Sequence, residues 1–384
     1  MLRLLARLRP HTMPVTYRHN RVVLFPDGNH FFQGLLSALR SAERVILLEY
    51  YIIRSDRTGS AFAAELIAAT RRGVRVLLIY DYIGCIDTPS SFFKNLSQHG
   101  IELIPFNVPS FRRGIHWFDR RNHRKLAIID GKLAFIGGFN IGDEYAGAAA
   151  LLNRFRDLGF SATGAVVEEL IGSFGDIWQM ERGNRPDLTA VCDRAKIGRR
   201  PGNATMAIIS GGPHQRSSSI RSAFLFNIAS ASVELLVANP YFVPGPRIVR
   251  ALLRAARRGV RVRLLMPDRS DVPLVRLVGR SSYGILLRGG IEIYEMEREL
   301  LHAKVMLVDG QRSVIGSANL DQRSFHRNFE INCLIDSRSF GTQIHRELEA
   351  DFQAARRVTL DRHEKRGIVL RVLEKIVNLF SWFL

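Results

Sequence analysis

Cysteines and long uncharged apolar runs are both scarce in this sequence, and each scarcity excludes a class of protein. The three cysteines are odd in number and scattered along 384 residues, at Cys85, Cys192 and Cys333. This spacing offers neither a disulfide framework nor a zinc cluster, and it fits reduced thiols in a cytosolic setting. No uncharged stretch of about 20 residues occurs, so we expect no transmembrane helix. The basic N-terminus also has no apolar run long enough for a signal peptide.

Acidic residues are outnumbered by basic ones. The chain has 36 Asp and Glu against 55 Lys and Arg, which gives a formal net charge of +19. Such an excess favours a polyanionic partner, and composition alone leaves nucleic acid and an anionic membrane surface both open. Hydrophobic residues make up 46% of the 384 positions, which is enough for two ordinary domains or one large duplicated unit.

One short motif occurs twice, and its two copies align without a gap. The first signature consists of His123, Lys125, Asp130 and Asn140. The second signature has the same residue types at His302, Lys304, Asp309 and Asn319. The offset is 179 residues for the histidines (302 − 123) and for the asparagines (319 − 140). A single His-x-Lys triplet carries little information, whereas two extended copies in register predict one site built from two halves.

The repeat extends well beyond the signatures. An apolar strand-like run, an amphipathic helical pattern, an Arg-Gly-Val strand start and a Gly-Ile-Glu segment recur in the same order. The first set is Arg44–Leu48, Ala61–Ala69, Arg71–Val76 and Gly100–Leu103, and the second is Val233–Ala238, Ile248–Ala256, Arg257–Val262 and Gly290–Ile293. Strand, helix, strand, helix, strand is therefore predicted twice, which indicates an α/β fold with a largely parallel or mixed sheet in each half.

These repeats divide the chain into five predicted segments. A basic N-terminal segment (1–19) precedes a first domain (20–182), whose signature region spans about residues 117–144. A linker rich in Gly, Pro, Arg and Asp (183–202) leads to a second domain (203–360), with its signature region at about residues 296–323. An amphipathic C-terminal helix (361–384) closes the chain.

Three further segments allow two interpretations each. Asn107–Asn122 is rich in Arg and aromatic residues and makes the first half about eleven residues longer here (190 − 179), either as a surface loop or as a substrate contact at the mouth of the site. Gly211–Ser219 is rich in groups that bind phosphate, although such stretches also form plain turns. Ile368–Leu384 has one apolar and one polar helical face, which fits an interfacial membrane helix or a helix packed on the core.

The spacing within each signature has a chemical meaning. Residues two apart on a strand face the same side, so the His imidazole and the Lys ammonium group are predicted side by side. The Asp-Gly dipeptides after each apolar run predict turns, which gives Asp130 and Asp309 a supporting rather than a direct chemical role. Asn140 and Asn319 return on the next strand, where they can donate to a phosphate oxygen.

Two signatures that face each other predict a pocket for a phosphodiester. The lysines and asparagines stabilise the phosphoryl oxygens as charge is redistributed. One histidine attacks phosphorus and forms a phosphohistidine, while the other protonates the leaving alcohol and then deprotonates the incoming one. The residues alone leave these two roles exchangeable. The chemistry requires no metal or other cofactor, and none is predicted.

A nucleophilic imidazole needs a partner on its other ring nitrogen, and this partner is usually a carboxylate. Asp157 and Glu330 follow their signature histidines by 34 and 28 residues and are the candidates. For each of them the alternative is a salt bridge on the surface.

The extended motif resembles that of the phospholipase D superfamily over roughly residues 20–360. The His-x-Lys-x4-Asp pattern is followed by Gly-Gly-x-Asn in one copy and Gly-Ser-x-Asn in the other, which adds Gly138 and Ser317 as supporting residues of the site. Asn239–Pro244 and Ile315–Ser324 narrow the resemblance to bacterial cardiolipin synthases.

Two departures from the family pattern stand out. Phe155 occupies the place of a Trp that precedes Arg-Asp in the family. The second departure is that the sequence lacks the N-terminal transmembrane helices of the longer synthases, so its overall layout is similar to the shorter type of cardiolipin synthase, which has no membrane span.

The resemblance implies two tandem phospholipase D-like α/β domains, related by pseudo-twofold symmetry, with one shared active site. It implies transfer of a phosphatidyl group from phosphatidylglycerol, or another phospholipid, to the hydroxyl of phosphatidylglycerol, with His123 as nucleophile and His302 as acid. It also implies a peripheral protein that binds anionic phospholipid on the cytoplasmic side of the bacterial inner membrane. It implies nothing about the oligomeric state.

Other functions stay open on the sequence. A hydrolytic phospholipase D or a phosphodiesterase nuclease would use the same site with water or a nucleic acid in place of the lipid alcohol, and the charge of +19 also suits nucleic acid. Tyr241-Phe242 and the C-terminal apolar face favour lipid. A non-catalytic anion-binding scaffold would be expected to lack at least one signature His or Lys, and none is missing.

Overall fold

The computed structural model of the chain describes residues 14–109, 116–147, 154–189, 201–213 and 218–367. Parts of five predicted segments lie outside these ranges. They are most of the basic N-terminal segment, part of the Arg-rich and aromatic loop, most of the linker, four residues of Gly211–Ser219, and the predicted amphipathic helix from residue 368. The domain boundaries thus stay predictions. In the described part of the chain, no helix combines the length and apolarity needed to cross a membrane.

The predicted order of strands and helices occurs in both halves. In the first half it is β2 (Val45–Tyr50), α3 (Arg57–Arg71), β3 (Arg75–Asp81), α4 (Ser90–Gln98) and β4 (Glu102–Phe106). In the second half it is β10 (Glu234–Ala238), α8 (Gly245–Arg257), β11 (Arg261–Pro267), α9 (Pro273–Ser281) with α10 (Tyr283–Arg288), and β12 (Glu292–Met296). Strands β2, β3 and β4 run parallel, as do β10, β11 and β12. The doubled α/β unit is therefore confirmed.

Each signature contributes a hairpin beside this parallel unit. β5 (Leu126–Ile129) pairs antiparallel with β2 and with β6 (Leu133–Gly137), and β14 (Val305–Val308) pairs in the same way with β10 and β15 (Arg312–Gly316). Both central residues of each turn have positive φ, as Asp-Gly hairpin turns require. The φ values are 52° and 66° at Asp130-Gly131 and 51° and 65° at Asp309-Gly310. The predicted turns are confirmed, and each half-sheet is mixed.

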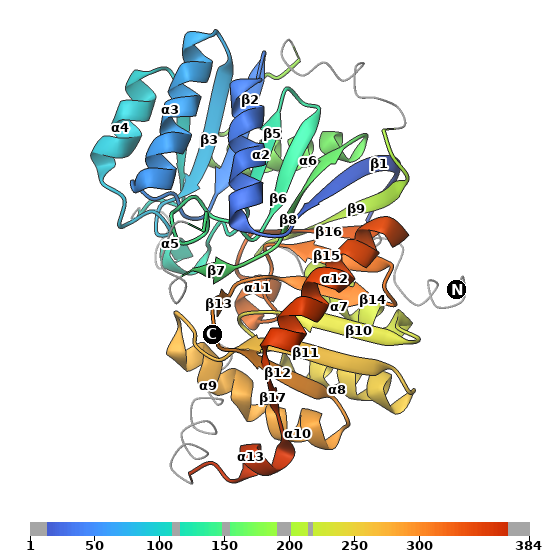
Figure 1. The fold of residues 1–384 in the computed structure, drawn as a ribbon. Coiled ribbons are helices and arrows are strands. Elements are labelled where there is room, and N and C mark those ends of the chain that lie inside the picture. Colours follow the sequence, from blue (N-terminus) through green and yellow to red (C-terminus); the bar gives the residue numbers. More distant parts are fainter. Residues whose placement is uncertain (1–13, 110–115, 148–153, 190–200, 214–217, 368–384) are drawn as a thin grey trace.

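The two halves join in one continuous sheet. β1 (Thr16–Phe25) pairs antiparallel both with β8 (Gly159–Thr163) and with β9 (Ala204–Gly211). β9 in turn pairs with β16 (Glu330–Asp336), and β17 (Arg356–Val358) forms one edge. Among the described residues the order of the 15 strands is β17-β12-β11-β10-β14-β15-β16-β9-β1-β8-β6-β5-β2-β3-β4. Outward from the β1–β9 junction both halves have the same order of equivalent strands, which is the expected pseudo-twofold relation (Figure 1).

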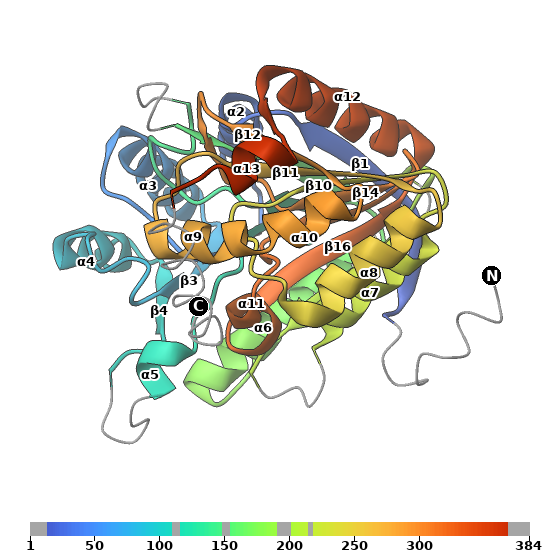
Figure 2. The ribbon, with the colours of Figure 1, turned by 90° about the horizontal axis from the view of Figure 1, so that it is seen from below.

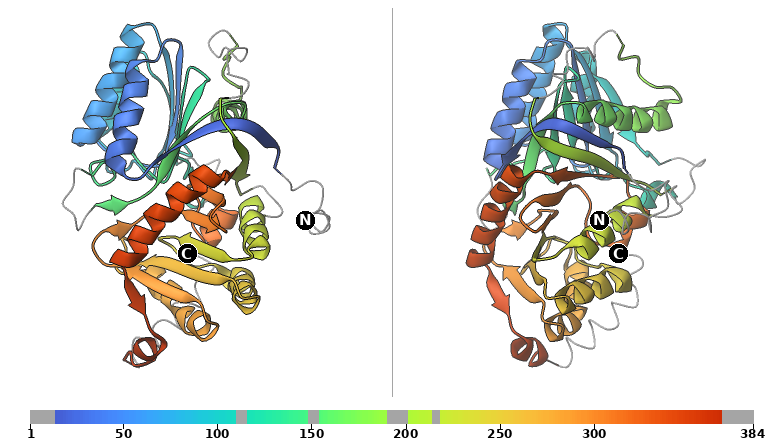
Figure 3. Two further views of the ribbon diagram at one scale, coloured as in Figure 1. Left: turned by 45° about the vertical axis from the view of Figure 1, so that its right-hand side comes forward. Right: turned by 90° about the vertical axis from the view of Figure 1, so that its right-hand side faces the viewer.

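Helices cover both faces of the sheet. α2 (Gly28–Arg40) packs beside α3, and its counterpart α7 (Ser219–Ser230) packs beside α8. α6 (Val166–Arg182) contacts β9 and α12 (Arg338–Ala354) contacts β1, so each of these helices reaches across the junction. In the right-hand view of Figure 3, α2, α3 and α12 lie on one side, and α6, α7 and α8 lie on the other. The largest apolar core draws on both halves, with Leu47 and Phe174 from one and Ile331 and Phe340 from the other.

Candidate active site

The two signature histidines lie where the halves meet. β7 (Phe155–Arg156) pairs in parallel with β13 (Leu300–Leu301), and the backbone N–H of His302 donates to the carbonyl of Arg156 at 2.8 Å. On the other side of the site, the N–H of His123 donates to the carbonyl of Phe329 at 2.9 Å. Each histidine is thus fixed to the backbone of the opposite half. Figure 1 shows β7, β13 and α11 (Gln322–His326) gathered between the two lobes.

The positions of the His-x-Lys triplets differ from the sequence expectation. We expected them on the strands themselves, but β5 begins at Leu126 and β14 at Val305, one residue after each lysine. The physical reason is the contact with the opposite half, which takes the backbone hydrogen bonds that a strand of the same sheet would otherwise use. Asn140 and Asn319 likewise follow strands β6 and β15 rather than lying within them.

A buried carboxylate from the opposite half holds each histidine. His123 Nδ1 lies 3.0 Å from Glu330 Oε2, and His302 Nδ1 lies 2.5 Å from Asp157 Oδ2. Glu330 and Asp157 are 0% and 1% exposed, so the surface salt bridge that the sequence left open does not apply to either. With Nδ1 engaged by a carboxylate, Nε2 is the ring nitrogen left for chemistry. The sequence identified both carboxylates, but it did not indicate that they pair across the halves.

Both signature lysines are buried beside the histidines. Lys125 Nζ donates to the carbonyl of His123 at 2.7 Å, and Lys304 Nζ donates to the carbonyl of His302. Burial lowers the pKa of Lys304 to about 8 and holds the pKa of Lys125 well below its usual range. A bound anion would reverse both shifts, because it stabilises the charged form of each lysine. The pocket is therefore prepared for a negatively charged group.

Glu330 lies in a cage of hydrogen-bond donors. Ser317 Oγ donates to it at 2.5 Å, Ser324 Oγ at 2.9 Å and Asn328 Nδ2 at 3.2 Å. Burial by itself would raise the pKa of Glu330, but the charge and hydrogen bond of His123, together with Lys125 and Ser317, lower it. Glu330 is consequently an ionised partner for His123. Ser324 ends the Ile315–Ser324 motif that carries the family resemblance, although we predicted neither Ser324 nor Asn328 as a site residue.

Asp157 has a different environment. Besides His302, its carboxylate accepts a hydrogen bond from the backbone N–H of Leu158 at 2.7 Å. Gly138 leaves room for it, since a Cβ there would lie 2.1 Å from Asp157 Oδ2. Burial raises the pKa of Asp157 to about 7. Burial and the charges of Lys304 and Lys125 also hold the pKa of His302 well below its usual value.

Aromatic rings pack against both histidines, and sequence reasoning missed most of them. Tyr51 meets the ring of His123 edge-on with 4.9 Å between centroids, and Lys125 Nζ lies 5.1 Å from the Tyr51 centroid. Tyr145 and Phe155 lie 5.3 and 5.0 Å from the ring of His302. Phe155, noted only as a departure from the family pattern, thus fills an aromatic position at the site. These contacts fix the ring orientations and exclude water.

The two asparagines have different surroundings. Asn140 Oδ1 accepts a hydrogen bond from the backbone N–H of Ile52 at 3.1 Å. Asn319 receives support through its own N–H, which donates to Ser324 Oγ at 3.0 Å. Its side-chain Oδ1 is buried and has no hydrogen-bond partner among the described residues. A polar atom buried in this way is costly to leave unpaired, and a bound hydroxyl group would satisfy it.

The two signature aspartates are not part of the pocket. Asp130 lies at the far end of β5 and accepts hydrogen bonds from the backbone N–H groups of Glu43, Arg44 and Val45 at 2.8–3.1 Å. Asp309 does the same for the N–H groups of Ser232, Val233 and Glu234. Each aspartate ties the signature hairpin to the start of the adjacent parallel strand.

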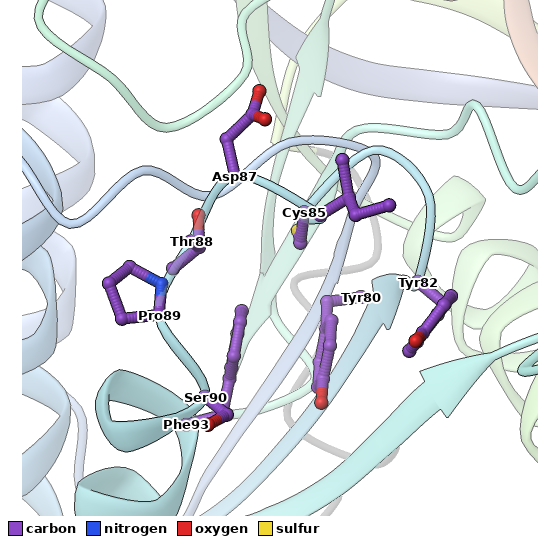
Figure 4. Close-up of a pocket in the computed structure, with 9 residues that line it drawn as sticks. Tyr80, Tyr82, Cys85, Asp87, Thr88, Pro89, Ser90 and Phe93 are labelled. Atoms are coloured by element: carbon purple, nitrogen blue, oxygen red, sulfur yellow. The ribbon is translucent and has the colours of Figure 1, made fainter.

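A cavity of about 360 Å³ lies between the end of β3 and the start of α4 in the first half (Figure 4). Its walls include Tyr80, Tyr82, Ile86 and Phe93, from β3, α4 and the loop between them. Cys85, also in the wall, has its sulfur 3.5 Å from the carbonyl oxygen of Tyr51. The cavity wall is therefore linked through Cys85 to the backbone of Tyr51, whose ring contacts His123.

Comparison with known proteins identifies the family. A family model described as "Cardiolipin synthase, PLD-like domain" matches residues 35–150 and 225–355. The cardiolipin synthase of Geobacillus kaustophilus is 36% identical over 387 residues, which cover 99% of this chain and 75% of that protein. The chain belongs to the cardiolipin synthase family.

A further relative belongs to the same family, and two solved structures show the fold. Cardiolipin synthase A of Pseudomonas putida is 34% identical and aligns with 94% of this chain and 75% of its own length. The crystal structure of phosphatidylserine synthase from Haemophilus influenzae matches with a TM-score of 0.74 at 13% identity, over 96% of this chain and 97% of that one. Polyphosphate kinase from Porphyromonas gingivalis matches with a TM-score of 0.55 at 13% identity, over 93% and 56%. These two structures share the fold of the family.

Proposed function

We propose that this phosphatidyltransferase of the cardiolipin synthase family joins two phosphatidylglycerol molecules through a covalent phosphohistidine. The observation that carries the proposal is the crossed pairing of His123 with Glu330 and of His302 with Asp157. Two oriented imidazoles beside two buried lysines are the groups that a two-step displacement at phosphorus needs.

In the first step, His123 Nε2 attacks the phosphorus atom of the donor lipid. The bond from phosphorus to the glycerol oxygen breaks, and the His302–Asp157 pair supplies the proton that the departing glycerol oxygen takes up. Lys125 and Lys304 lie close enough to both histidines to influence their pKa values, so their charges reach the phosphoryl oxygens of a substrate between them. The product of this step is a phosphatidyl group on His123 and free glycerol.

In the second step, His302 Nε2 takes the proton from a hydroxyl group of the acceptor lipid. The hydroxyl oxygen attacks phosphorus and the bond to His123 breaks, which regenerates the free imidazole. The buried Asn319 Oδ1 is a hydrogen-bond acceptor for the second hydroxyl of the acceptor glycerol. Packing of Tyr51, Tyr145 and Phe155 around the histidines disfavours water as the acceptor.

The substrates define where the protein acts. Both lipids are components of the bilayer, and the net charge of +19 suits the anionic surface that phosphatidylglycerol creates. We place the protein on the cytoplasmic side of the bacterial inner membrane as a peripheral enzyme.

Lipid analysis tests this proposal. Purified protein is incubated with phosphatidylglycerol vesicles, with the His123→Ala variant as the control for contaminating activity. Cardiolipin and glycerol in equal amounts are expected. Phosphatidic acid in place of cardiolipin would mean a hydrolase, and DNA cleavage without lipid turnover would mean a nuclease; either result refutes the proposal.

A further inference from the structure

Exposed apolar side chains follow equivalent strands in the two halves, in a loop in the first half and at the start of α9 in the second. The loop after β3 carries Tyr82 and Ile86, which are 36% and 64% exposed. The segment after β11, the counterpart of β3, carries Val272 and Leu274, which are 37% and 53% exposed. We call these four residues the apolar rim. In Figures 1 and 2 the β3–α4 connection and α9 both lie on the left-hand side of the molecule.

The first-half loop of the rim borders the active site. Asp81, the last residue of β3 before this loop, accepts a hydrogen bond at 2.8 Å from the backbone N–H of Asn122, which directly precedes His123. Gly84, between the two rim residues, packs so closely on Tyr51 that a Cβ would lie 2.8 Å from its ring. Tyr51 in turn contacts the ring of His123.

The second-half loop borders the same site from the other side. Asp271 directly precedes Val272 and accepts a hydrogen bond from Tyr241 at 2.6 Å. Phe242, the next residue after Tyr241, forms a β-bridge with Leu320, which directly follows the signature residue Asn319. These contacts place Asp271 and Val272 beside the second signature. The apolar rim therefore flanks one site from both halves.

Single exposed apolar residues are normal on protein surfaces, but paired ones around a functional site mark a contact surface. The carboxyl ends of parallel strands are where α/β folds place their ligands, and both rim loops leave such strand ends. Tyr82 and Ile86 also line the cavity of about 360 Å³, and Figure 4 shows Tyr82 in its wall. Val233, although 68% exposed, precedes β10 at the opposite end of that strand from the site, so it is not part of the rim.

We propose that the apolar rim is the surface that inserts into an anionic phospholipid bilayer and delivers lipid headgroups to the two histidines. This inference rests on the proposed function, because a lipid-using site must open toward the bilayer. Charge complementarity selects the occupant: a chain with a net charge of +19 is attracted to anionic lipid, and an apolar rim then adds short-range burial at the interface. Because the two parts of the rim follow equivalent strands, both halves of the protein would contact the membrane at the same time.

The experiment compares two double variants of the full chain with a matched control. The rim variants are Ile86→Asp with Leu274→Asp, and Ile86→Ser with Leu274→Ser, and the control is Val233→Asp. Each protein is sedimented with vesicles of phosphatidylglycerol and phosphatidylcholine. Each is then assayed on those vesicles and on a short-chain phosphatidylglycerol kept below its micelle-forming concentration.

The aspartate double variant is expected to lose vesicle binding at least about tenfold, because apolar burial is replaced by charge repulsion, and the serine variant somewhat less. Vesicle turnover should fall in parallel, while turnover of the monomeric lipid stays within about twofold of the unsubstituted protein. Val233→Asp should leave all three measurements unchanged.

Several results would overturn the inference. Unchanged sedimentation of both rim variants would do so, as would an equal loss in Val233→Asp or a change in oligomeric state without a change in vesicle binding. Loss of turnover on the monomeric lipid would mean that the substitutions damage the site instead. If the unsubstituted protein binds vesicles through the rim but makes no cardiolipin, the rim stands and the proposed function fails.

Discussion

The two histidine–carboxylate pairs occupy equivalent places, yet their carboxylates have opposite electrostatic surroundings. Ser317, Ser324 and Asn328 all donate to Glu330. The charge and hydrogen bond of His123, the charge of Lys125 and the hydrogen bond of Ser317 lower the pKa of Glu330 despite its burial, so it stays ionised. Among the described residues, Asp157 accepts one backbone N–H in addition to its contact with His302, and burial raises its pKa to about 7. A permanently ionised partner suits a nucleophile that must hold a positive charge once it is phosphorylated. A carboxyl that titrates near neutrality suits a pair that gives and takes one proton.

A single position accounts for part of this difference. Gly138 and Ser317 are equivalent residues of the two signatures, and each faces the carboxylate of its own half. The serine hydroxyl stabilises Glu330, whereas the glycine only makes room for Asp157. Duplication supplied two similar scaffolds, and small changes around them separated the two roles.

Substitution of each histidine in turn is expected to have the largest effect and tests whether the two pairs have different roles. We expect His123→Ala and His302→Ala each to reduce transfer by on the order of 10⁴-fold or more, because neither half completes the site alone. The two variants should differ in one respect: His302→Ala can still form the phosphatidyl-histidine slowly, whereas His123→Ala cannot. Quenched reactions with radiolabelled donor lipid, analysed for acid-labile label on the protein, measure this difference. Label on His123→Ala would reverse the assigned roles, and an active single variant would exclude a shared site.

A milder substitution keeps the shape of each carboxylate but removes its charge. Glu330→Gln is expected to reduce kcat by on the order of 10²- to 10⁴-fold, since His123 loses the ion that fixes its tautomer. Asp157→Asn should cost less at low pH, where Asp157 is already protonated in the native enzyme. Steady-state rates at pH 6 for both variants and for the unsubstituted protein provide the measurement. Equal losses at pH 6 would mean that the two pairs do not differ as described.

Much of the fold was accessible from the sequence because it depends on local patterns. The repeated strand and helix order follows from hydrophobic periodicity, and the hairpin turns follow from Asp130-Gly131 and Asp309-Gly310. The continuous sheet was not accessible, because β1 pairs with both β8 and β9 and nothing in its own sequence specifies two partners.

The sequence was enough to predict which residues form the site, but not which carboxylate pairs with which histidine. The duplicated spacing identified the histidines and lysines, and the need for an orienting carboxylate identified Asp157 and Glu330. That each carboxylate serves the opposite half depends on the packing of the β7–β13 pair and of Phe329, which is a tertiary property. Tyr51 could not be selected either, since an aromatic residue after a buried strand is most often part of the core.

The pH dependence separates the two pairs in the native enzyme. Burial lowers the pKa of His123, so its neutral, nucleophilic form persists to somewhat below pH 6.5. Asp157 loses its proton as the pH rises through about 7, and Lys304 does so near 8. The value of kcat/KM for the donor lipid should therefore fall with rising pH above about 7, approaching tenfold per unit, and fall again on the acid side as His123 is protonated. Rates on monomeric lipid from pH 5 to 9 measure both limbs, and Asp157→Asn should move the alkaline limb upward. An unmoved limb would assign it to another group.

The smallest effect on activity is expected for Asp130 and Asp309, whose surroundings are alike in the two halves. Asp130 and Asp309 each hold three backbone N–H groups at the start of the adjacent strand, and each has a positive φ that Ala tolerates poorly. Replacement of either by Ala should lower the free energy of unfolding by about 2 kcal/mol, while Asn, which accepts the same hydrogen bonds and tolerates this backbone conformation, should cost less. Urea unfolding measures the loss, and kcat per folded molecule should not change. A fall in kcat after substitution of only one of the two aspartates would show that the hairpins also differ in function. Equal losses of stability without a change in kcat would mean that the functional difference between the halves is limited to Glu330 and Asp157.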